Sequence, residues 1–169
     1  MIEKAGLSGG KGVEFYGCGM ADMNITLTNN TILSSGSGIE GYEGPPSVLH
    51  WKLTNNIIFS MMNGANAVDV GSGAVQIVSS EGNLTFGFSA NGISPAPLMS
   101  AGDDTSGVAT PASVFVAPAA GDFHLLPGGQ GAGTGINVFG VPSYGAVTTD
   151  ILQAPRPMVG AWARGAYGL

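Results

Sequence analysis

"NITLTNNTIL" (residues 24–33) and "HWKLTNNIIF" (residues 50–59) decide the fold of this chain, because they place one Leu-Thr-Asn-Asn tetrad twice, 26 positions apart. A weaker copy, "NLTF" at 83–86, follows "NIIF" at 56–59 with a shift of 27. A second set of positions shares the spacing, since "GVEFY" (12–16) and "GIEGY" (38–42) also lie 26 apart, and "AVD" (67–69) extends the set with a shift of 29. Two independent sets with one spacing indicate a structural repeat.

Side chains alternate within each copy. Ile25 and Leu27 fall on one face of an extended segment and Thr26 on the other, and Trp51 is opposite Lys52 in the same way. This period of two predicts short strands. Strands with Gly or Asn corners, stacked once per turn, form a parallel β-helix solenoid whose successive turns (coils) lie about 4.8 Å apart. The sequence therefore predicts an all-β, parallel β-helix of few coils.

Stacking of coils brings equivalent side chains into columns. At the corner it predicts an inward-turned amide ladder in which each side chain bonds its neighbours along the axis. The ladder residues are Asn30, Asn56 and Asn83. The second set of positions predicts an aliphatic column inside the coils. Its residues are Val13, Ile39 and Val68.

Composition supports strands and excludes several classes of function. The chain has 29 Gly among 169 residues, 44% hydrophobic residues and 9% charged residues, which is typical of strands with tight turns. Its net charge is −6 and its five cations are scattered, whereas a nucleic-acid partner requires clustered cations.

We expect no membrane span, because no apolar run reaches about 18 residues. The N-terminal residues carry no secretory signal. Cys18 has no cysteine partner, so we expect a buried, inert thiol.

The C-terminal third carries a family-like pattern. It contains "FVAP" (115–118), "GDFHL" (121–125), "DI" (150–151), "RP" (156–157) and "GAW" (160–162). This pattern resembles the terminal segment of right-handed parallel β-helix proteins of the pectate-lyase-like superfamily, and it implies the C-terminal portion of such a fold. The chain departs from the pattern in two places. "GQGA" stands where Ser-Pro-Ala is usual, and Ala163 replaces an acidic residue. The segment ends enzymes and non-enzymes alike, so it implies fold rather than activity.

We expect one domain in three parts. Residues 1–95 form the coils, 96–112 a loop, and 113–169 the terminal coil and C-terminal cap. Asp103 and Asp104 lie in the loop and are interpreted as turn formers.

An acidic column is the first candidate site. Its residues are Glu14, Glu40 and Asp69. Stacked carboxylates repel one another unless a cation lies between them, so the column is a candidate Ca²⁺ site. A solvated outer face that needs no metal is the alternative.

A second candidate site is the surface formed by Trp51, Lys52 and His50. A ring that stacks on a sugar and a cation that pairs with its carboxylate would bind an acidic polysaccharide. The alternative is an isolated charge on an outward strand face. His124 is expected on the outer face without a catalytic partner, and Arg156 is expected to pair with Asp150 or Asp122.

The N-terminal stretch is rich in glycine and predicts no capping helix, so we expect another subunit, or further chain, to cover that end of the stack. The sequence favours a non-enzymatic structural protein of a virion surface or extracellular assembly. The phage capsid-decoration, fibre and spike proteins, commonly homotrimers, are the type we expect. Met61, Met62, Met99 and Trp162 are candidate contact residues. A polysaccharide lyase-like or glycoside hydrolase fragment, or a sugar-binding module, stays the alternative.

Overall fold

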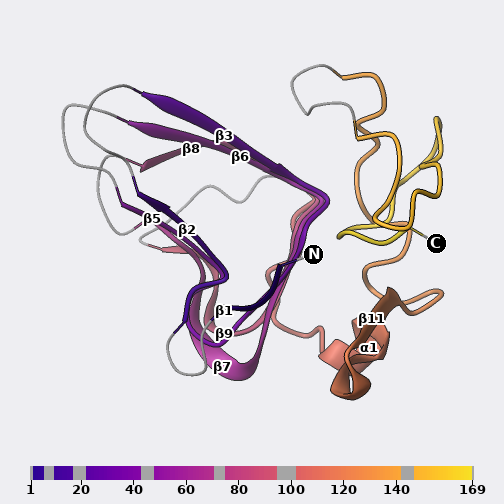
Figure 1. Ribbon diagram of the computed structural model, residues 1–169, viewed down its shortest axis with the longest axis horizontal. Helices are drawn as coiled ribbons and strands as arrows, with labels where there is room; N and C mark the ends of the chain where they lie inside the picture. Colours follow the sequence, from indigo (N-terminus) through magenta and orange to yellow (C-terminus); the bar gives the residue numbers. More distant parts are fainter. Residues whose placement is uncertain are drawn as a thin grey trace.

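The computed structural model describes residues 2–5, 10–16, 22–42, 48–70, 75–94, 102–141 and 147–168. Cys18 and Met99 lie outside the described residues, so their expected roles stay predictions. The described chain is nearly all β, with parallel strands in curled sheets, and this confirms the predicted all-β class (Figure 1). No helix of the described residues has the length and apolar composition of a membrane-crossing segment.

Within the described ranges, nine strands precede the C-terminal segment. They are β1 (Ile2–Ala5), β2 (Val13–Tyr16), β3 (Met23–Thr28), β4 (Thr31–Ser34), β5 (Ile39–Tyr42), β6 (Leu49–Thr54), β7 (Ile57–Asp69), β8 (Val75–Glu81) and β9 (Leu84–Ser94). One sheet has the order β1-β4-β7-β5-β2, with β9 also paired to β7, and a second has the order β3-β6-β8. In Figure 1, β3, β6 and β8 lie over one another along one side of the molecule, and β2 and β5 lie over one another along another.

The pairing register reproduces the spacing of the sequence repeat. Every pair between β3 and β6 joins residues 26 apart, as in Leu27↔Leu53, and the pairs of β4 with β7 and of β2 with β5 have the same offset. The start of β7 pairs with β9 at an offset of 27, as in Ile57↔Leu84. All these pairs are parallel, so the interval of 26 is the length of chain between one strand and its hydrogen-bonded neighbour.

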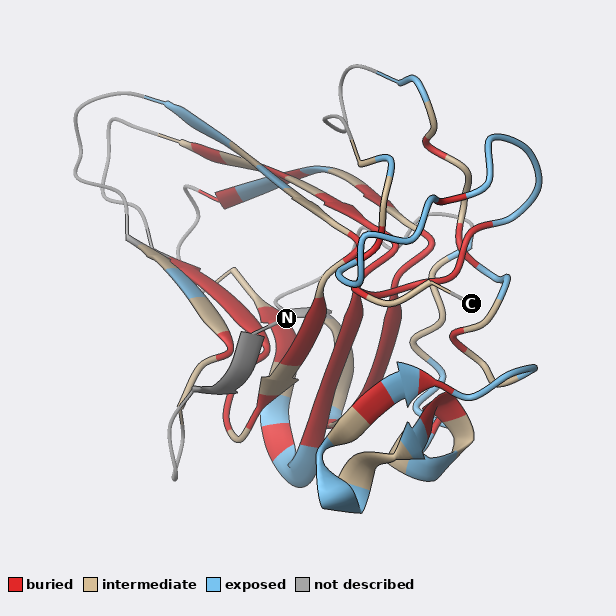
Figure 2. Ribbon diagram, turned by 45° about the vertical axis from the view of Figure 1, so that its right-hand side comes forward, coloured by how far each residue is buried: buried red, intermediate tan, exposed pale blue. Residues whose placement is uncertain are grey.

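Two apolar clusters cover opposite faces of β7. Ile58 belongs to the cluster inside the curled sheets, together with Trp51, Ile32 and Ile39. Ile57 and Phe59 belong to a cluster on the other face, beneath the C-terminal segment. A strand with both faces covered has no polar face, which explains the unbroken apolar run "IIF". Buried residues accordingly fill the central strands in Figure 2.

The C-terminal segment begins with α1 (Pro111–Val114), β10 (Phe115–Ala117), the short 3₁₀ helix η1 (Pro118–Ala120) and β11 (Asp122–Leu125). β10 and β11 pair antiparallel and place Phe115 and Phe123 on Phe59 of β7, with ring centroids 5.0 and 5.7 Å away. Phe59 in turn stacks on Phe86 of β9 at 5.3 Å. These four rings hold the segment on the outer face of the first sheet.

Gly38 lies where two walls of the curled sheet meet, and a side chain has no room there. A Cβ atom added to Gly38 would lie 2.3 Å from Ile58 Cγ2 and 2.4 Å from the Ala67 carbonyl oxygen. The carbonyl belongs to the paired backbone and cannot move without breaking the register. Gly92, on β9, has nothing within 4 Å of the same position.

We therefore predict that Gly38→Ala lowers the free energy of unfolding by about 1–3 kcal/mol, the usual cost of overpacking a tight site. Gly92→Ala is the matched control and should leave stability unchanged or raise it slightly, because alanine restricts the unfolded chain. Urea denaturation of both variants measures the difference. Equal midpoints for the two would contradict the close approach at Gly38.

Candidate functional site

Each Leu-Thr-Asn-Asn tetrad turns the chain at its first asparagine. Asn29 and Asn55 adopt left-handed backbone conformations, with φ of 56° and 54°, and Gly82 takes the equivalent position at 66°. Asparagine is among the few residues other than glycine that adopt this conformation readily. The turn connects β3 to β4, β6 to β7, and β8 to β9, and it directs the second asparagine of each tetrad inward.

The second asparagines form a hydrogen-bonded column. Asn30 Nδ2 donates to Asn56 Oδ1 at 3.1 Å, and Asn56 Nδ2 donates to Asn83 Oδ1 at 2.9 Å. The backbone N–H groups of Asn30 and Asn56 donate to the same oxygens, at 3.0 and 2.9 Å. A backbone N–H can only donate, so each of these bonds fixes which amide atom faces it. The bonds between asparagines are therefore polar, each side chain donating to the oxygen of the next one, while the Nδ2 atoms of Asn56 and Asn83 also donate back to the Leu27 and Leu53 carbonyls, both at 2.9 Å.

Asp103 ends the ladder. Its Oδ1 accepts from the backbone N and from Nδ2 of Asn83, at 2.6 and 2.9 Å, and its Oδ2 accepts from Ser80 Oγ at 2.7 Å. Residue 104 continues the stack by a parallel bridge to Leu84. The interpretation of Asp103 as a turn former is therefore wrong, because an ionised carboxylate is the acceptor that the last asparagine requires. Asp104 does form a turn, accepting from the N and Oγ of Ser106.

The first asparagines hold the C-terminal segment from the outside. Asn29 Nδ2 donates to the Ala163 carbonyl at 3.0 Å. The Asn55 side chain pairs with the backbone of Ile136 twice, donating to its carbonyl at 2.7 Å and accepting from its N–H at 2.8 Å. Gly82 completes this column, because a Cβ there would lie 2.5 Å from Asn55 Oδ1. Sequence reasoning missed this role, although the doubled asparagine was its signal.

The acidic residues are register neighbours, and a lysine lies between two of them. Glu14 pairs with Glu40 and Glu40 with Asp69 along adjacent strands. Lys11 Nζ contacts Glu14 Oε1 and lies 3.0 Å from Glu40 Oε1. Hydrogen bonds to these two carboxylates, Glu14 first, raise the pKa of Lys11 above its usual value. The cation that the stacked carboxylates need is supplied there by Lys11.

Asp69, the third carboxylate, accepts instead from Asn66 Nδ2 at 2.8 Å. No group of three or more His, Cys, Asp or Glu side chains that could hold a metal ion occurs in the described ranges. Ca²⁺ binding at this column therefore has no supporting geometry in those ranges.

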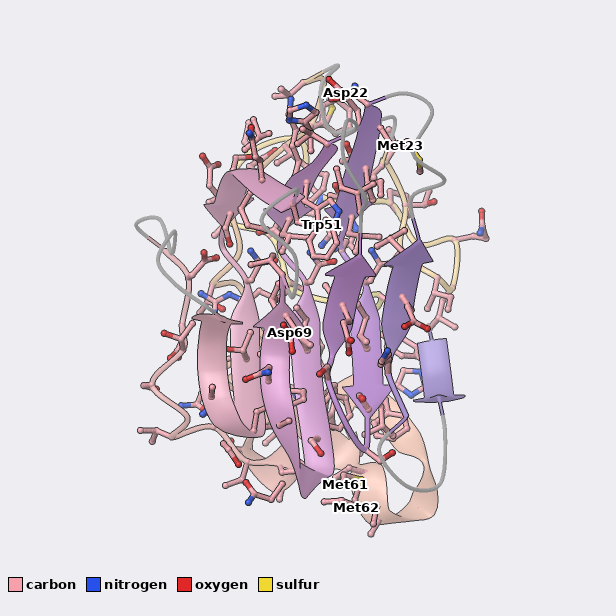
Figure 3. The ribbon with its side chains drawn as sticks, turned by 90° about the vertical axis from the view of Figure 1, so that its left-hand side faces the viewer. Asp22, Met23, Trp51, Met61, Met62 and Asp69 are labelled. Atoms are coloured by element: carbon pink, nitrogen blue, oxygen red, sulfur yellow. The ribbon has the colours of Figure 1, made fainter. Side chains whose placement is uncertain are left out.

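The Trp51, Lys52 and His50 side chains do not share a surface. Trp51 is 0% exposed and packs inside the curled sheets, 5.6 Å from the Phe15 ring. Its ring lies against Gly41, where an added Cβ would approach it to 2.3 Å. Lys52 and His50 alternate with it on β6, so they lie on the opposite face. A sugar at that face cannot stack on the indole. Trp51 lies within the interior in Figure 3.

His124 lies on the outer face, as expected, and its imidazole has a carboxylate neighbour. Its Nδ1 lies 2.6 Å from Asp122 Oδ1, and its ring packs on Tyr167 at 4.5 Å between centroids. The Asp122 carboxylate also accepts the backbone N–H of His124, and this bond, followed by the side-chain bond, lowers the pKa of Asp122. The two side chains are exposed on β11, so the arrangement is an oriented imidazole at the surface.

Two buried arginines bind backbone carbonyls of the C-terminal segment. Arg156 donates to the carbonyls of Ala163 and Gly165, at 3.3 and 2.9 Å, and lies 5.3 Å from the centre of the Trp162 ring. Arg164 donates to the Gly102 carbonyl at 2.9 Å. Burial lowers the pKa of both guanidinium groups. The expected pairing of Arg156 with Asp150 or Asp122 is replaced by carbonyl bonds, with Asp150 close enough to favour the charge.

The proposed contact residues divide in two. Trp162 is fully buried and its Nε1 donates to the Pro157 carbonyl at 2.8 Å, so it supplies no surface. Met61 and Met62 are 50% and 67% exposed and lie together at the bend of β7 (Figure 3).

An apolar cavity of about 390 Å³ opens beside Met61. It is lined by Leu33, Met61, Phe123 and residues 118–121. No charged side chain lines this cavity, so it offers space for an apolar group and no means of catalysis.

No family model, curated protein or solved structure matches the chain. The resemblance of its C-terminal segment to the pectate-lyase-like superfamily therefore rests on the sequence pattern alone, and the parallel strands that precede this segment are compatible with a β-helix-like fold.

Removal of a middle ladder residue should break the corner. Asn56→Ala leaves the N and Nδ2 of Asn30 without their acceptor and Asn83 Oδ1 without its side-chain donor, and an unpaired buried polar group costs about 1–3 kcal/mol. We expect the free energy of unfolding to fall by roughly 2–6 kcal/mol, twice that cost, because both ladder neighbours of Asn56 lose a partner. Asn24→Ala, at an exposed position of β3, is the control and should change it by less than about 0.5 kcal/mol. A similar fall in the free energy of unfolding for both variants would show that the ladder hydrogen bonds make no particular contribution to stability.

Asp150 makes the C-terminal segment sensitive to acid. Burial alone would raise its pKa, but the N–H groups of Gly168, Ala154 and Leu152, with Arg156 nearby, lower it overall. A lowered pKa in the folded state contributes stability above the unfolded value of about 3.9 and loses it as pH falls through the folded value. We expect Asp150→Asn to lose less stability than the wild type between pH 6 and pH 3. Chemical denaturation at both pH values measures this, and equal losses would contradict it.

Proposed function

We propose that the chain is a non-enzymatic structural protein, built as a few-coil right-handed parallel β-helix and acting as a subunit of a surface assembly. The phage capsid-decoration, fibre and spike proteins are the type we propose, with a homotrimer as the assembled form and a virion surface or extracellular location. The parallel register at intervals of 26 and 27 residues supports the β-helix, because a winding chain brings equivalent positions together once per coil.

One observation carries the proposal: the corner amides, the acidic column and the buried arginines are engaged in holding the protein together. The ladder amides and Asp103 bond one another, Lys11 joins two carboxylates, and the buried arginines bind carbonyls. An active site instead needs groups that are aimed at a substrate and free to exchange protons. The His124–Asp122 pair is exposed, and neither its contacts nor the apolar cavity supply a nucleophile or a second acid.

No observation on the described residues favours the sugar-binding alternative. Trp51, whose ring was expected to stack on the sugar, is buried. His50 Nε2 lies 3.8 Å from Asp22 Oδ2, so a carboxylate is already close to that imidazole. A polysaccharide carboxylate would compete with Asp22 for this position. The lyase alternative also needs a second cation near Lys52. The strand residues paired with Lys52 are Thr26 and Ser79, and neither carries a charge.

The mass in solution tests the assembly. Light scattering after gel filtration should give three times the chain mass of 16.9 kDa. A monomer at micromolar concentration would overturn the homotrimer. Incubation with acidic polysaccharides should give no unsaturated uronide, and an ultraviolet signal from that product would overturn the non-enzymatic assignment.

The exposed methionines at the β7 bend provide the contact test. We predict that Met61→Lys together with Met62→Lys reduces the mass to that of a monomer, because a charge placed in an apolar contact must be desolvated without a partner. Val159→Lys is the control, since Val159 is 82% exposed on the C-terminal segment, away from this bend. Retention of the trimer by the double variant would exclude the methionine surface from the interface.

A further inference from the structure

The ladder has an unused acceptor at its first residue. Asn30 donates to Asn56 through both its backbone N and its Nδ2, at 3.0 and 3.1 Å. In the two coils that follow, the equivalent Oδ1 atoms of Asn56 and Asn83 each accept two such bonds. No hydrogen bond from a described residue reaches the Oδ1 of Asn30. The half-buried Asn30 therefore presents the acceptor that would receive one more coil.

The strand before this corner has an open edge. β3 is the terminal strand of the order β3-β6-β8, and among the described strands its only partner is β6. Met23 N and Asn29 N donate to the carbonyls of Val48 and Thr54 on the β6 side. Successive N–H groups of a strand point to opposite edges, so those of Asn24, Thr26 and Thr28 point to the open edge.

Nothing in β3 protects that edge. Native edge strands are usually blunted by charged side chains, proline, bulges or a covering segment. The sequence of β3 is "MNITLT", with no charge and no proline, and its pairing with β6 has no bulge. Met23 is 40% exposed, and Ile25 and Leu27 are only partly buried against the interior cluster. These three apolar side chains would gain cover from an added strand.

The polarity of the ladder excludes the later end of a second copy as the occupant. A parallel stack of two copies would bring the coil that ends in Asp103 onto β3, with its carboxylate at the corner. The Asp103 carboxylate and Asn30 Oδ1 would then face each other as two side-chain acceptors, and Asn30 Oδ1 would lack the side-chain amide donor that Asn56 Oδ1 and Asn83 Oδ1 each receive. A two-fold, antiparallel pairing of β3 with itself leaves Asn30 Oδ1 without a donor, because the corners then lie at opposite ends.

We propose that β3 and Asn30 form a docking site for a parallel β-strand of a partner chain that ends in a corner asparagine. Leu27 precedes Asn30 by three positions, and Ile25 precedes Leu27 by two. The partner strand therefore carries apolar residues five and three positions before its asparagine, aligned with Ile25 and Leu27. The inference rests on the proposed structural function and names a second, different subunit in the assembly.

A labelled peptide of residues 49–56, "LHWKLTNN", is the probe, because this segment lies on the other edge of β3 in the same register. Its anisotropy should rise and saturate on titration with the full chain. A peptide carrying Asn56→Asp, whose side chain cannot donate to Asn30 Oδ1 and would present a carboxylate to it, should bind at least about tenfold more weakly. Absence of binding, or equal affinity for the two peptides, would overturn the proposal.

The edge itself is tested on the protein with a matched pair. Thr26→Pro removes an N–H that points to the open edge and leaves the bonds to β6, whereas Thr26→Val retains the N–H. The valine variant should bind the first peptide as the wild type does, and the proline variant should lose binding. Equal binding by both would overturn the proposal. If Thr26→Pro does not fold, the comparison of the two peptides on the wild-type chain decides alone.

The peptide experiments and the mass measurement can give different answers, so failure of the docking site can be told apart from failure of the proposed structural function. A monomeric chain that binds the peptide would retain the docking site and exclude the homotrimer. A trimer that fails to distinguish the two peptides would retain the structural function and exclude the docking site.

Discussion

The amide ladder at the corner between the two sheets is the constraint on which the structure depends. Its hydrogen bonds run from one asparagine to the next, so each repeat must place its corner directly beside that of the repeat before it. The inward amides are largely removed from water, where an unpaired group is costly. Satisfying them fixes the register of the flanking strands, and the register in turn aligns the apolar interior and the outer phenylalanine stack.

Two adjacent asparagines perform opposite tasks because the backbone between them turns through a left-handed residue. The second amide bonds along the axis within the coils. The first bonds outward, to the segment around Ile136 and Ala163, and so attaches the C-terminal segment to the same corner. Arg164 ties that segment to Gly102, next to the residue that ends the ladder. The corner thus joins the coils to one another and to the segment that covers them.

Much of this could be predicted from the sequence, since a repeated tetrad at a fixed interval states which residues become neighbours. Local and periodic properties follow from the repeat. They include the interval of 26, the alternation along β6 and the column of Val13, Ile39 and Val68. Lys11 and Asp103 could not be placed in this way, because neither lies on a repeat. Lys11 reaches two carboxylates through a long side chain, and Asp103 lies twenty residues beyond the asparagine that it accepts from. The alternation did imply that Trp51 and Lys52 face opposite sides, and the predicted sugar surface overlooked it.

Charged side chains are also placed according to burial. Stacked strands and the segment that covers them bury many side chains, so a charged group there needs a partner of its own. Glu40 is buried and lies beside Lys11, Asp150 accepts three backbone N–H groups, and Arg156 and Arg164 bind carbonyls. Asparagine avoids this difficulty, because its amide both donates and accepts and can repeat without limit along an axis. The first charged acceptor, Asp103, therefore ends the ladder, and only the opposite end, at Asn30, retains the capacity to be extended.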